Sequence, residues 1–274
     1  MTAQILRPVW SARAGVHAAF TWRQGGVSAA PWAALNLGGH VGDDAHAVAE
    51  NRRRVSAALR LPGEPIWLNQ VHGTRVYDVD AQGEGRVSAD HAAAGAPIAD
   101  AAVTRQPGTV LAILVADCLP VLLASRSGEA VAAAHAGWRG LAAGVLEATV
   151  SALRVPPEHL CAWLGPAIGA RRFVVGEEVR AAFVDRDRHG AQAFRALAGA
   201  SDADAGADAG GGAGREGRTR WLCDLELLAR QRLRVLGVGA QSSAGVCTYE
   251  DAARCFSYRR DGRTGRMAAL IWRE

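Results

Sequence analysis

The chain has 274 residues, of which 49% are hydrophobic and 21% are charged, so it can bury one large core or two small ones and is not a disordered chain. All 31 residues in the Lys+Arg count are arginines, which excludes mechanisms that need a lysine, such as Schiff-base chemistry or a P-loop. The net charge of +4 is mild and the arginines are interspersed with acids, so we expect no nucleic-acid partner.

The sequence lacks the usual marks of export and of membrane insertion. The N-terminus has no charged stretch followed by an apolar one, and the longest apolar run, 110–124, is interrupted by Asp117 and is shorter than the ~20 residues that a spanning helix needs. The five cysteines match no disulfide framework, so we expect reduced thiols. These features predict a cytoplasmic protein without membrane contact, and no feature indicates an obligate protein partner.

The N-terminal third of the chain is predicted to hold strands and loops around one helix. Residues 15–37 alternate short apolar runs with glycine and polar residues, as strands and loops do. Asp43 and Asp44 can cap a helix that ends near Leu61, before a Pro-Gly pair. Two strand candidates follow, at residues 66–70 and 75–79.

The central third carries the clearest pattern. Residues 109–116 are a run of Val, Leu, Ile and Ala, as in a strand that is buried on both faces. Shorter strands of the same kind are predicted at 121–124, 130–134 and 160–164. A helix is predicted from Leu141 to Arg154, where two prolines follow.

The C-terminal part combines helices with one segment of biased composition. Residues 176–197 are predicted to be mainly helical. Residues 198–217 are rich in Ala, Gly and Asp, and we expect them to form a mobile surface insertion. Asp224 is expected to cap a helix that ends at Leu236, before Gly237.

The tail, residues 256–272, is predicted to form a strand, a turn at 260–263 and a return strand. The chain shows neither an internal repeat nor a linker between two units. We therefore expect one α+β domain over residues 1–274.

Three residues that can carry chemistry stand in a turn or at the ends of predicted strands. His72 lies in a turn, and Cys118 and His135 each follow an apolar strand, where rigid strands aim side chains and loops leave room for a ligand. If these positions converge, two imidazoles and a thiolate form a zinc site with a fourth place for water or substrate. The same residues suit a thiolate nucleophile with a histidine base. Without convergence they are a core thiol and two loop histidines.

Asp117 directly precedes Cys118 at the end of the most apolar strand. A charge at such a position is costly unless it is paired or hydrogen-bonded. We expect its carboxylate either to orient His72 or His135 from behind the ligand, or to cap the turn.

Several arginines stand beside glycines or near the start of helices, where forked donors and free N–H groups can hold a phosphate or a carboxylate. These arginines are Arg23, Arg52, Arg53, Arg139, Arg259 and Arg260. Each of them, taken alone, also fits a solvated surface position.

Eight short motifs, spaced along nearly the whole chain, occur together in a fixed order. They are RQGGVS at 23–28, LNL at 35–37, HVGD at 40–43, NQVHG at 69–73, ADCLPV at 116–121, HAGWRG at 135–140, GPAIG at 165–169 and SYRRD at 257–261. Through these motifs the chain resembles the bacterial YfiH family, also called the polyphenol-oxidase or laccase-domain family, from about residue 15 to residue 272.

The resemblance implies a single domain with a central mixed β-sheet flanked by helices, and a zinc site formed by His72, Cys118 and His135. It implies phosphorolysis of adenosine, inosine and S-methyl-5′-thioadenosine, with adenosine deamination beside it. The family also carries a laccase label with copper, and a role in editing peptidoglycan precursors. Trp22 and residues 171–173 depart from the family pattern, which bears on substrate preference and not on the three ligands.

The leading hypothesis is therefore a zinc-dependent purine nucleoside phosphorylase whose partners are a small nucleoside and phosphate. Substrate contacts are expected from Arg52, Arg139 and Arg260 to phosphate, from Asn36 and Asn69 to sugar or base, and from Arg23. The runner-up is a cysteine or metal hydrolase that removes a wrongly incorporated amino acid from a peptidoglycan precursor, with Cys118 as nucleophile. A copper-dependent polyphenol oxidase is third, since the sequence has no His-x-His pair, and a non-catalytic binding protein remains as the last class.

Overall fold

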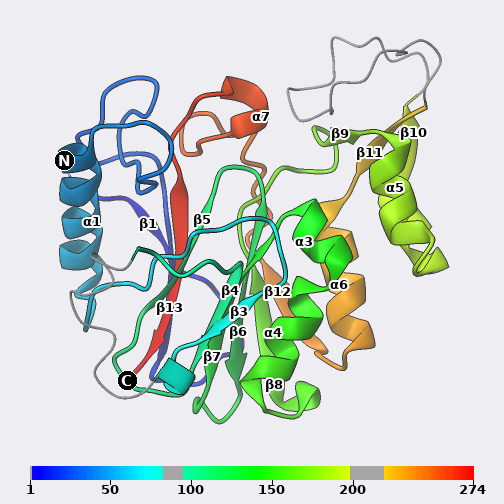
Figure 1. Ribbon diagram of the computed structural model, residues 1–274, viewed down its shortest axis with the longest axis horizontal. Helices are drawn as coiled ribbons and strands as arrows, with labels where there is room; N and C mark the ends of the chain where they lie inside the picture. Colours follow the sequence, from blue (N-terminus) through cyan, green and yellow to red (C-terminus); the bar gives the residue numbers. More distant parts are fainter. Residues whose placement is uncertain (1, 83–94, 198–218) are drawn as a thin grey trace.

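The computed structural model describes residues 2–82, 95–197 and 219–274. In these ranges a four-stranded and a six-stranded β-sheet lie face to face (Figure 1). One helix covers the outer side of the four-stranded sheet, and several cover the outer side of the six-stranded sheet. The predicted α+β class with a mixed sheet flanked by helices is confirmed, although two stacked sheets, not one, form the centre. The insertion predicted at 198–217 lies outside the described residues.

The larger sheet has six strands in the order β12-β8-β6-β7-β4-β3. These strands are β3 (Val76–Asp78), β4 (Ala101–Thr104), β6 (Leu119–Ser125), β7 (Val131–Ala136), β8 (Leu160–Leu164) and β12 (Ala240–Ser243). The two outermost pairs are parallel and the pairs between them are antiparallel. Pro120 pairs with His135, so the start of β6 lies beside the end of β7.

The smaller sheet is antiparallel, with the strand order β1-β2-β13-β5. Its strands are β1 (Ile5–Leu6), β2 (Val16–Thr21), β5 (Leu111–Val115) and β13 (Met267–Arg273). Every residue of β5 is buried, because one face meets the larger sheet and the other meets a helix. This burial on both faces is what the apolar run at 109–116 predicts.

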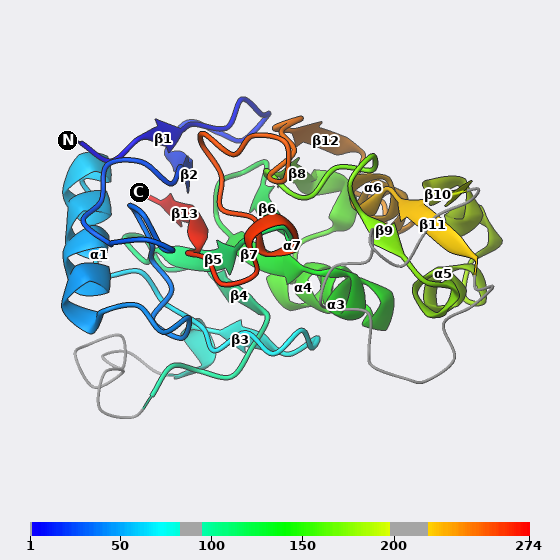
Figure 2. The ribbon, with the colours of Figure 1, turned by 90° about the horizontal axis from the view of Figure 1, so that it is seen from above.

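Helices cover the outer faces of both sheets (Figure 2). Helix α1 (Ala45–Leu59) packs on the smaller sheet, and the Asp44 side chain caps it by accepting from the N–H of Ala47, as predicted. The larger sheet is covered by α3 (Trp138–Ala143), α4 (Val145–Leu153) and α6 (Leu225–Val235). No helix in the described ranges combines the length and the hydropathy that crossing a bilayer requires.

The segment 176–197, predicted to be mainly helical, divides into three elements. Helix α5 (Glu177–Val184) and a 3-10 helix (Arg188–Ala193) are followed by strand β10 (Phe194–Leu197). β10 belongs to a three-stranded sheet in the order β10-β11-β9, with β11 at Arg220–Cys223 and β9 at Val174–Val175. Pairing with a strand more than twenty residues later thus overrides the local helical preference.

Three further predictions are wrong in detail. The helix predicted over 141–154 begins earlier and is split into α3 and α4 at Gly144, whose φ of 108° ends the first helix. The first strand of the predicted C-terminal hairpin is instead helix α7 (Tyr258–Asp261), capped by the side chain of Ser257. Residues 66–70 pair only through isolated bridges and form no strand.

The packing between the two sheets yields a stability prediction. Leu122 on β6 is fully buried in the core between the sheets, so Leu122→Ala should lower the free energy of unfolding by about 2–5 kcal/mol through the cavity that it leaves. Urea denaturation measures this change. Val27→Ala, at a side chain that is 44% exposed, is the control and should change the same quantity by less than about 0.5 kcal/mol. Equal losses in both variants would contradict the packing described above.

Candidate metal centre

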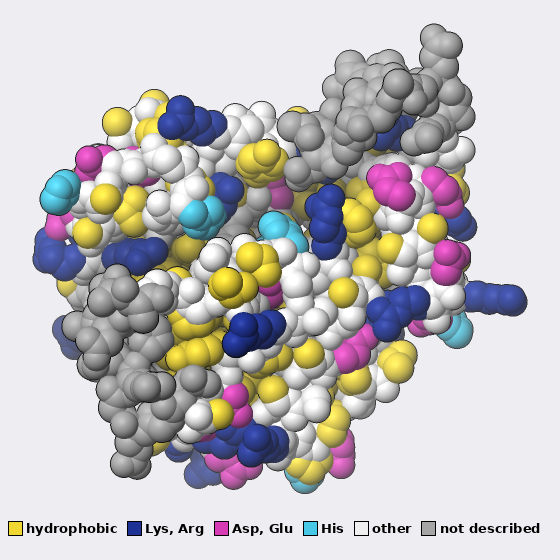
Figure 3. Space-filling view, viewed as in Figure 1, with side chains coloured by type: hydrophobic (Ala, Val, Ile, Leu, Met, Phe, Trp, Pro, Cys, Tyr) yellow, Lys and Arg dark blue, Asp and Glu magenta, His cyan; other side chains and the backbone are white. Residues whose placement is uncertain are grey.

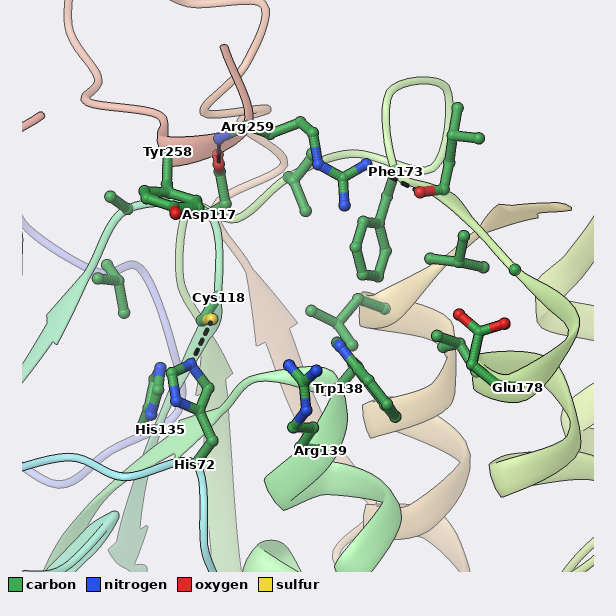
Figure 4. A pocket seen from close by; sticks show the side chains of 18 of the residues that line it. His72, Asp117, Cys118, His135, Trp138, Arg139, Phe173, Glu178, Tyr258 and Arg259 are labelled. Carbon is green, nitrogen blue, oxygen red and sulfur yellow. Dashed lines mark hydrogen bonds between the residues drawn. The ribbon is translucent and has the colours of Figure 1, made fainter. Parts of the chain in front are cut away.

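The structure brings the three residues predicted as metal ligands together (Figure 4). The ligand atoms of His72, Cys118 and His135 all lie within 4.8 Å of one another. Sγ of Cys118 is 3.8 Å from Nε2 of His72, and the two imidazole rings meet edge to face with their centroids 4.8 Å apart. The geometric convergence that the zinc hypothesis requires is therefore present.

The local backbone explains this convergence. Cys118 lies where the chain leaves β5 in one sheet and enters β6 in the other, and Asp117 makes the crossover with a φ of 102°. His135 stands near the end of β7, opposite Pro120. Gly137 follows, and a Cβ there would lie 2.9 Å from Sγ of Cys118 and 3.1 Å from the ring of His72. Glycine at this position therefore leaves room for the thiol and the imidazole.

A buried aspartate that sequence reasoning missed organises both histidines. Nδ1 of His135 donates to Oδ1 of Asp100 at 2.9 Å, and the Asp100 carboxylate also accepts the N–H groups of Val71, His72 and Gly73 at 3.1, 2.9 and 2.7 Å. Burial acts to raise the pKa of Asp100, but these donors and the charge of His135 lower it below its ordinary value. With Nδ1 bound in this way, His135 keeps Nε2 for the cluster.

Asp117 has a different position from the one expected, since it orients neither histidine. Its carboxylate accepts the hydroxyls of Thr248 at 2.6 Å and Ser257 at 3.0 Å, and the N–H of Arg259 at 2.7 Å. Burial raises the pKa of Asp117, and these three donors oppose the increase. We correct the expectation accordingly: Asp117 holds the start of α7 over the site, and Asp100 is the carboxylate behind the histidine.

The thiol of Cys118 and the imidazole of His135 shift each other's pKa. Burial acts to raise the pKa of Cys118, but the charge of His135 and hydrogen bonds from both histidines lower it to about 6. Burial acts to lower the pKa of His135, but Cys118 and Asp100 raise it to about 9. In the metal-free protein at neutral pH, a thiolate therefore stands beside an imidazolium, which must release its proton when a metal binds.

The donor set fits zinc. Two imidazole nitrogens and one thiolate are typical ligands of an open zinc site, and tetrahedral zinc places such donors about 3.5 Å apart. The 3.8 Å separation of Sγ and Nε2 is close to that value. All three residues line one cavity, from which a substrate could reach a metal that they hold.

This cavity has a volume of about 980 Å³ and opens on the face seen in Figure 3, where histidine and arginine side chains surround a hollow. Its wall is part apolar and part charged. The residues labelled around it in Figure 4 are Trp138 and Arg139 from α3, Phe173 before β9, Glu178 from α5, and Tyr258 and Arg259 from α7. Arg259 donates to the carbonyl of Val174 at 2.8 Å and so connects α7 to β9 across the cavity.

Of the six residues predicted to contact substrate, the structure places one at this cavity. Arg139 lines it, with its guanidinium 4.5 Å from the centroid of the Trp138 ring. Within the described ranges, the lining residues do not include Arg23, Asn36, Arg52, Asn69 or Arg260.

The three arginines outside the cavity bind the protein's own backbone. Arg23 donates to two loop carbonyls, Arg52 donates to the carbonyl of Leu37, and Arg260 donates to three carbonyls and pairs with Asp261. Arg52 lines a separate, smaller hollow beside α1. We therefore correct the expectation that Arg52 and Arg260 face a phosphate at the cluster and that Arg23 contacts the substrate there.

The two asparagines also lie outside the cavity lining. Asn36 is fully buried, and its Oδ1 accepts the N–H groups of Gly38 and Arg266. Asn69 bridges to Ile98 through its backbone. The sequence suggested that both side chains contact the substrate, but neither lines the cavity.

Among the cavity residues that sequence reasoning missed are His40, Tyr258 and Arg266. His40 and Tyr258 stand in the HVGD and SYRRD motifs, which were the available signal for them. Arg266 stands in no motif and precedes β13, so only the tertiary structure reveals its position.

The Asp100 contacts predict a loss of metal affinity. Asp100→Asn should weaken zinc binding by roughly 10–100-fold, because the amide orients His135 and the 71–73 turn less well than the carboxylate does. Competition against a chromophoric chelator measures the affinity. Asp187→Asn removes a similar bond, from Nδ1 of His189, on the surface and should leave zinc affinity unchanged. Unchanged affinity in Asp100→Asn would refute the role given to this carboxylate.

The close approach at Gly137 makes an independent prediction. Gly137→Ala should lower zinc affinity at least about tenfold, since the new Cβ must displace the thiol or the imidazole. Zinc retained after gel filtration and the circular dichroism spectrum together distinguish a damaged site from a misfolded chain. The control is Gly239→Ala, where nothing lies within 4 Å of the added atom. Full zinc retention by Gly137→Ala would rule out the proposed crowding.

Comparison with known proteins agrees with the motifs. Residues 17–274 match the family described as multi-copper polyphenol oxidoreductase laccase. The chain is 48% identical to a purine nucleoside phosphorylase of Pseudomonas aeruginosa over 97% of both chains, and 45% identical to purine nucleoside phosphorylase YfiH of Escherichia coli over 98% of this chain and 99% of the other. The crystal structure of a Neisseria meningitidis protein, 43% identical, matches with a TM-score of 0.83 and covers 98% of this chain and 99% of its own. The chain therefore belongs to the laccase-domain family that includes YfiH.

Proposed function

We propose that the protein is a zinc-dependent purine nucleoside phosphorylase that acts on adenosine, inosine and S-methyl-5′-thioadenosine. The observation that carries the proposal is the convergence of His72, Cys118 and His135 on the wall of a cavity large enough for a nucleoside. The names of the Pseudomonas and Escherichia relatives support the reaction class.

Phosphorolysis sets clear demands on the site. An oxygen of monohydrogen phosphate forms a bond to C1′ of the ribose while the bond from C1′ to the base nitrogen breaks, and the phosphate proton ends on the base. The sugar becomes oxocarbenium-like, and the base accumulates negative charge as it leaves. The site must therefore hold an anion, exclude water and stabilise the departing base.

The residues of this chain meet these demands as follows. When bound, zinc would supply a Lewis acid, which both phosphorolysis and a second activity, hydrolytic deamination of adenosine, can use. His72, Cys118 and His135 would hold it, with Asp100 fixing the orientation of His135. Arg139 offers a guanidinium at the cavity wall to an anionic group of the substrates.

The apolar part of the cavity suits the purine. Ile168, Phe173 and Val175 line it, and Trp138 stands beside them. Such a wall excludes water and offers aromatic faces to a planar base.

A second candidate function is a thiol hydrolase that cleaves an amide of a peptidoglycan precursor. The thiolate of Cys118 beside the imidazolium of His135 favours this candidate, because that pair is what nucleophilic thiol catalysis requires. The two candidates differ in their need for metal: chelation should abolish a zinc-dependent reaction and spare a thiol hydrolase.

The test of the leading proposal is release of hypoxanthine from inosine in the presence of phosphate. Cys118→Ser should reduce turnover by more than about 100-fold through loss of the thiolate ligand. Cys247→Ser, at a thiol that accepts the N–H of Gly169 outside the cavity, should keep activity. Chelation should remove the activity and added zinc should restore it. Equal turnover by Cys118→Ser and the unsubstituted protein would end the proposal.

A further inference from the structure

Arg266 and His40 are among the nitrogen-bearing side chains that line the cavity without belonging to the metal cluster. One terminal nitrogen of Arg266 donates to the carbonyls of Thr264 and Gly265, at 3.0 and 3.1 Å. Within the described ranges no carboxylate pairs with Arg266. A half-buried guanidinium thus faces the cavity with donors to spare.

The position of Arg266 is fixed by a buried amide. Oδ1 of Asn36 accepts the N–H of Arg266 at 2.8 Å and that of Gly38 at 2.9 Å, and the N–H of Leu37 donates to the carbonyl of Arg266 at 3.0 Å. The stem of Arg266 packs against Gly38, where a Cβ would lie 2.8 Å from its Cγ. His40 follows in the same loop. Arg266 is therefore held in place before any ligand arrives.

The charges at this part of the cavity favour an anion. Burial lowers the pKa of Arg266, and Cys118, Asp117 and Tyr258 oppose this decrease, so the guanidinium lies close to the cluster. The hydrogen bonds of Asp117 come from Thr248, Ser257 and Arg259 and not from Arg266. Arg139 adds a second guanidinium to the lining of the same cavity.

We propose that Arg266, assisted by His40, binds the inorganic phosphate that attacks the nucleoside; this inference rests on the proposed phosphorylase function. A guanidinium presents two parallel N–H donors that match two phosphate oxygens, and an imidazole N–H can serve a third. Tyr258, whose ring lies 5.9 Å from the guanidinium carbon of Arg266, and Phe173 stand on different sides of the cavity in Figure 4. Phosphate on the Tyr258 side and base on the Phe173 side then leave the ribose between them, beside the cluster.

This assignment replaces Arg52 and Arg260, two of the three arginines that the sequence suggested for phosphate. Arg52 and Arg260 have their donors on backbone carbonyls, whereas Arg266 lines the cavity. In the reaction, the bound phosphate oxygen bonds to C1′, the electron pair of the broken bond goes to the base nitrogen, and the phosphate proton follows it. Arg266 itself neither gains nor loses a proton.

The test separates the two substrates kinetically. In the zinc-loaded protein, Arg266→Met should raise the KM for phosphate by roughly 10–100-fold, the loss expected for a charge-assisted hydrogen-bonding group, while the KM for inosine changes by less than about threefold. Arg266→Lys keeps the positive charge but lacks the two parallel N–H donors, so its KM for phosphate should lie between those of Arg266→Met and the unsubstituted protein. Arg263→Met is the matched control, because Arg263 stacks on Trp32 outside the cavity in the same loop, and it should leave both KM values unchanged.

Direct binding of inorganic phosphate keeps the inference separate from the proposed function. Calorimetric titration of the zinc-loaded protein should detect phosphate binding that is lost in Arg266→Met and weakened in His40→Gln, with His40→Gln deciding the matter if the arginine variant fails to fold. Turnover of inosine with an unchanged phosphate KM in the Arg266 and His40 variants overturns the inference alone. If the protein splits no nucleoside, the proposed function fails. The inference fails as well if these variants bind phosphate as tightly as the unsubstituted chain does, or if neither the variants nor the unsubstituted chain bind phosphate.

Discussion

A single carboxylate, that of Asp100, accepts the imidazole N–H of His135 and three consecutive N–H groups of the turn that carries His72. The side chain is fully buried, and a buried charge is tolerated only when donors surround it. The carbonyl of Asp100 also accepts the N–H of His135 at 2.7 Å. Asp100 thereby connects the start of β4, the end of β7 and the 71–73 turn. These connections set the distance between the two imidazoles.

Those parts of the fold that depend on neighbouring residues were predictable from the sequence. Asp44 and Asp224 cap α1 and α6 through bonds to N–H groups three residues later, which a reader of the sequence can anticipate. Helix α7 was not predictable in this way. Its first turn is held by the carboxylate of Asp117, which precedes Ser257 by 140 positions. Tyr258–Asp261 therefore form a helix where the local pattern predicts a strand and a turn.

The candidate site divides along the same line. The ligands His72, Cys118 and His135 could be named because strand ends and motifs pointed to them. The carboxylate that orients them could not be predicted, since Asp100 stands before a short strand with no motif around it. The arginines show a further limit: Arg260 lies within a motif and binds backbone carbonyls, while Arg266 lies outside one and faces the cavity. The direction of a long side chain depends on which acceptors the fold places around it.

The position of Cys118 ties the chemistry to the architecture. Cys118 lies in the three-residue connection, 116–118, where the chain crosses from the smaller sheet to the larger one, next to a left-handed backbone at Asp117. A metal ion held by this sulfur and the two imidazoles would stabilise the fold around the crossover, because a ligand that binds only the folded state adds to its stability. Folding of this region and occupancy of the centre are then reciprocal: a change that destabilises the fold there weakens metal binding, and loss of the metal destabilises the fold.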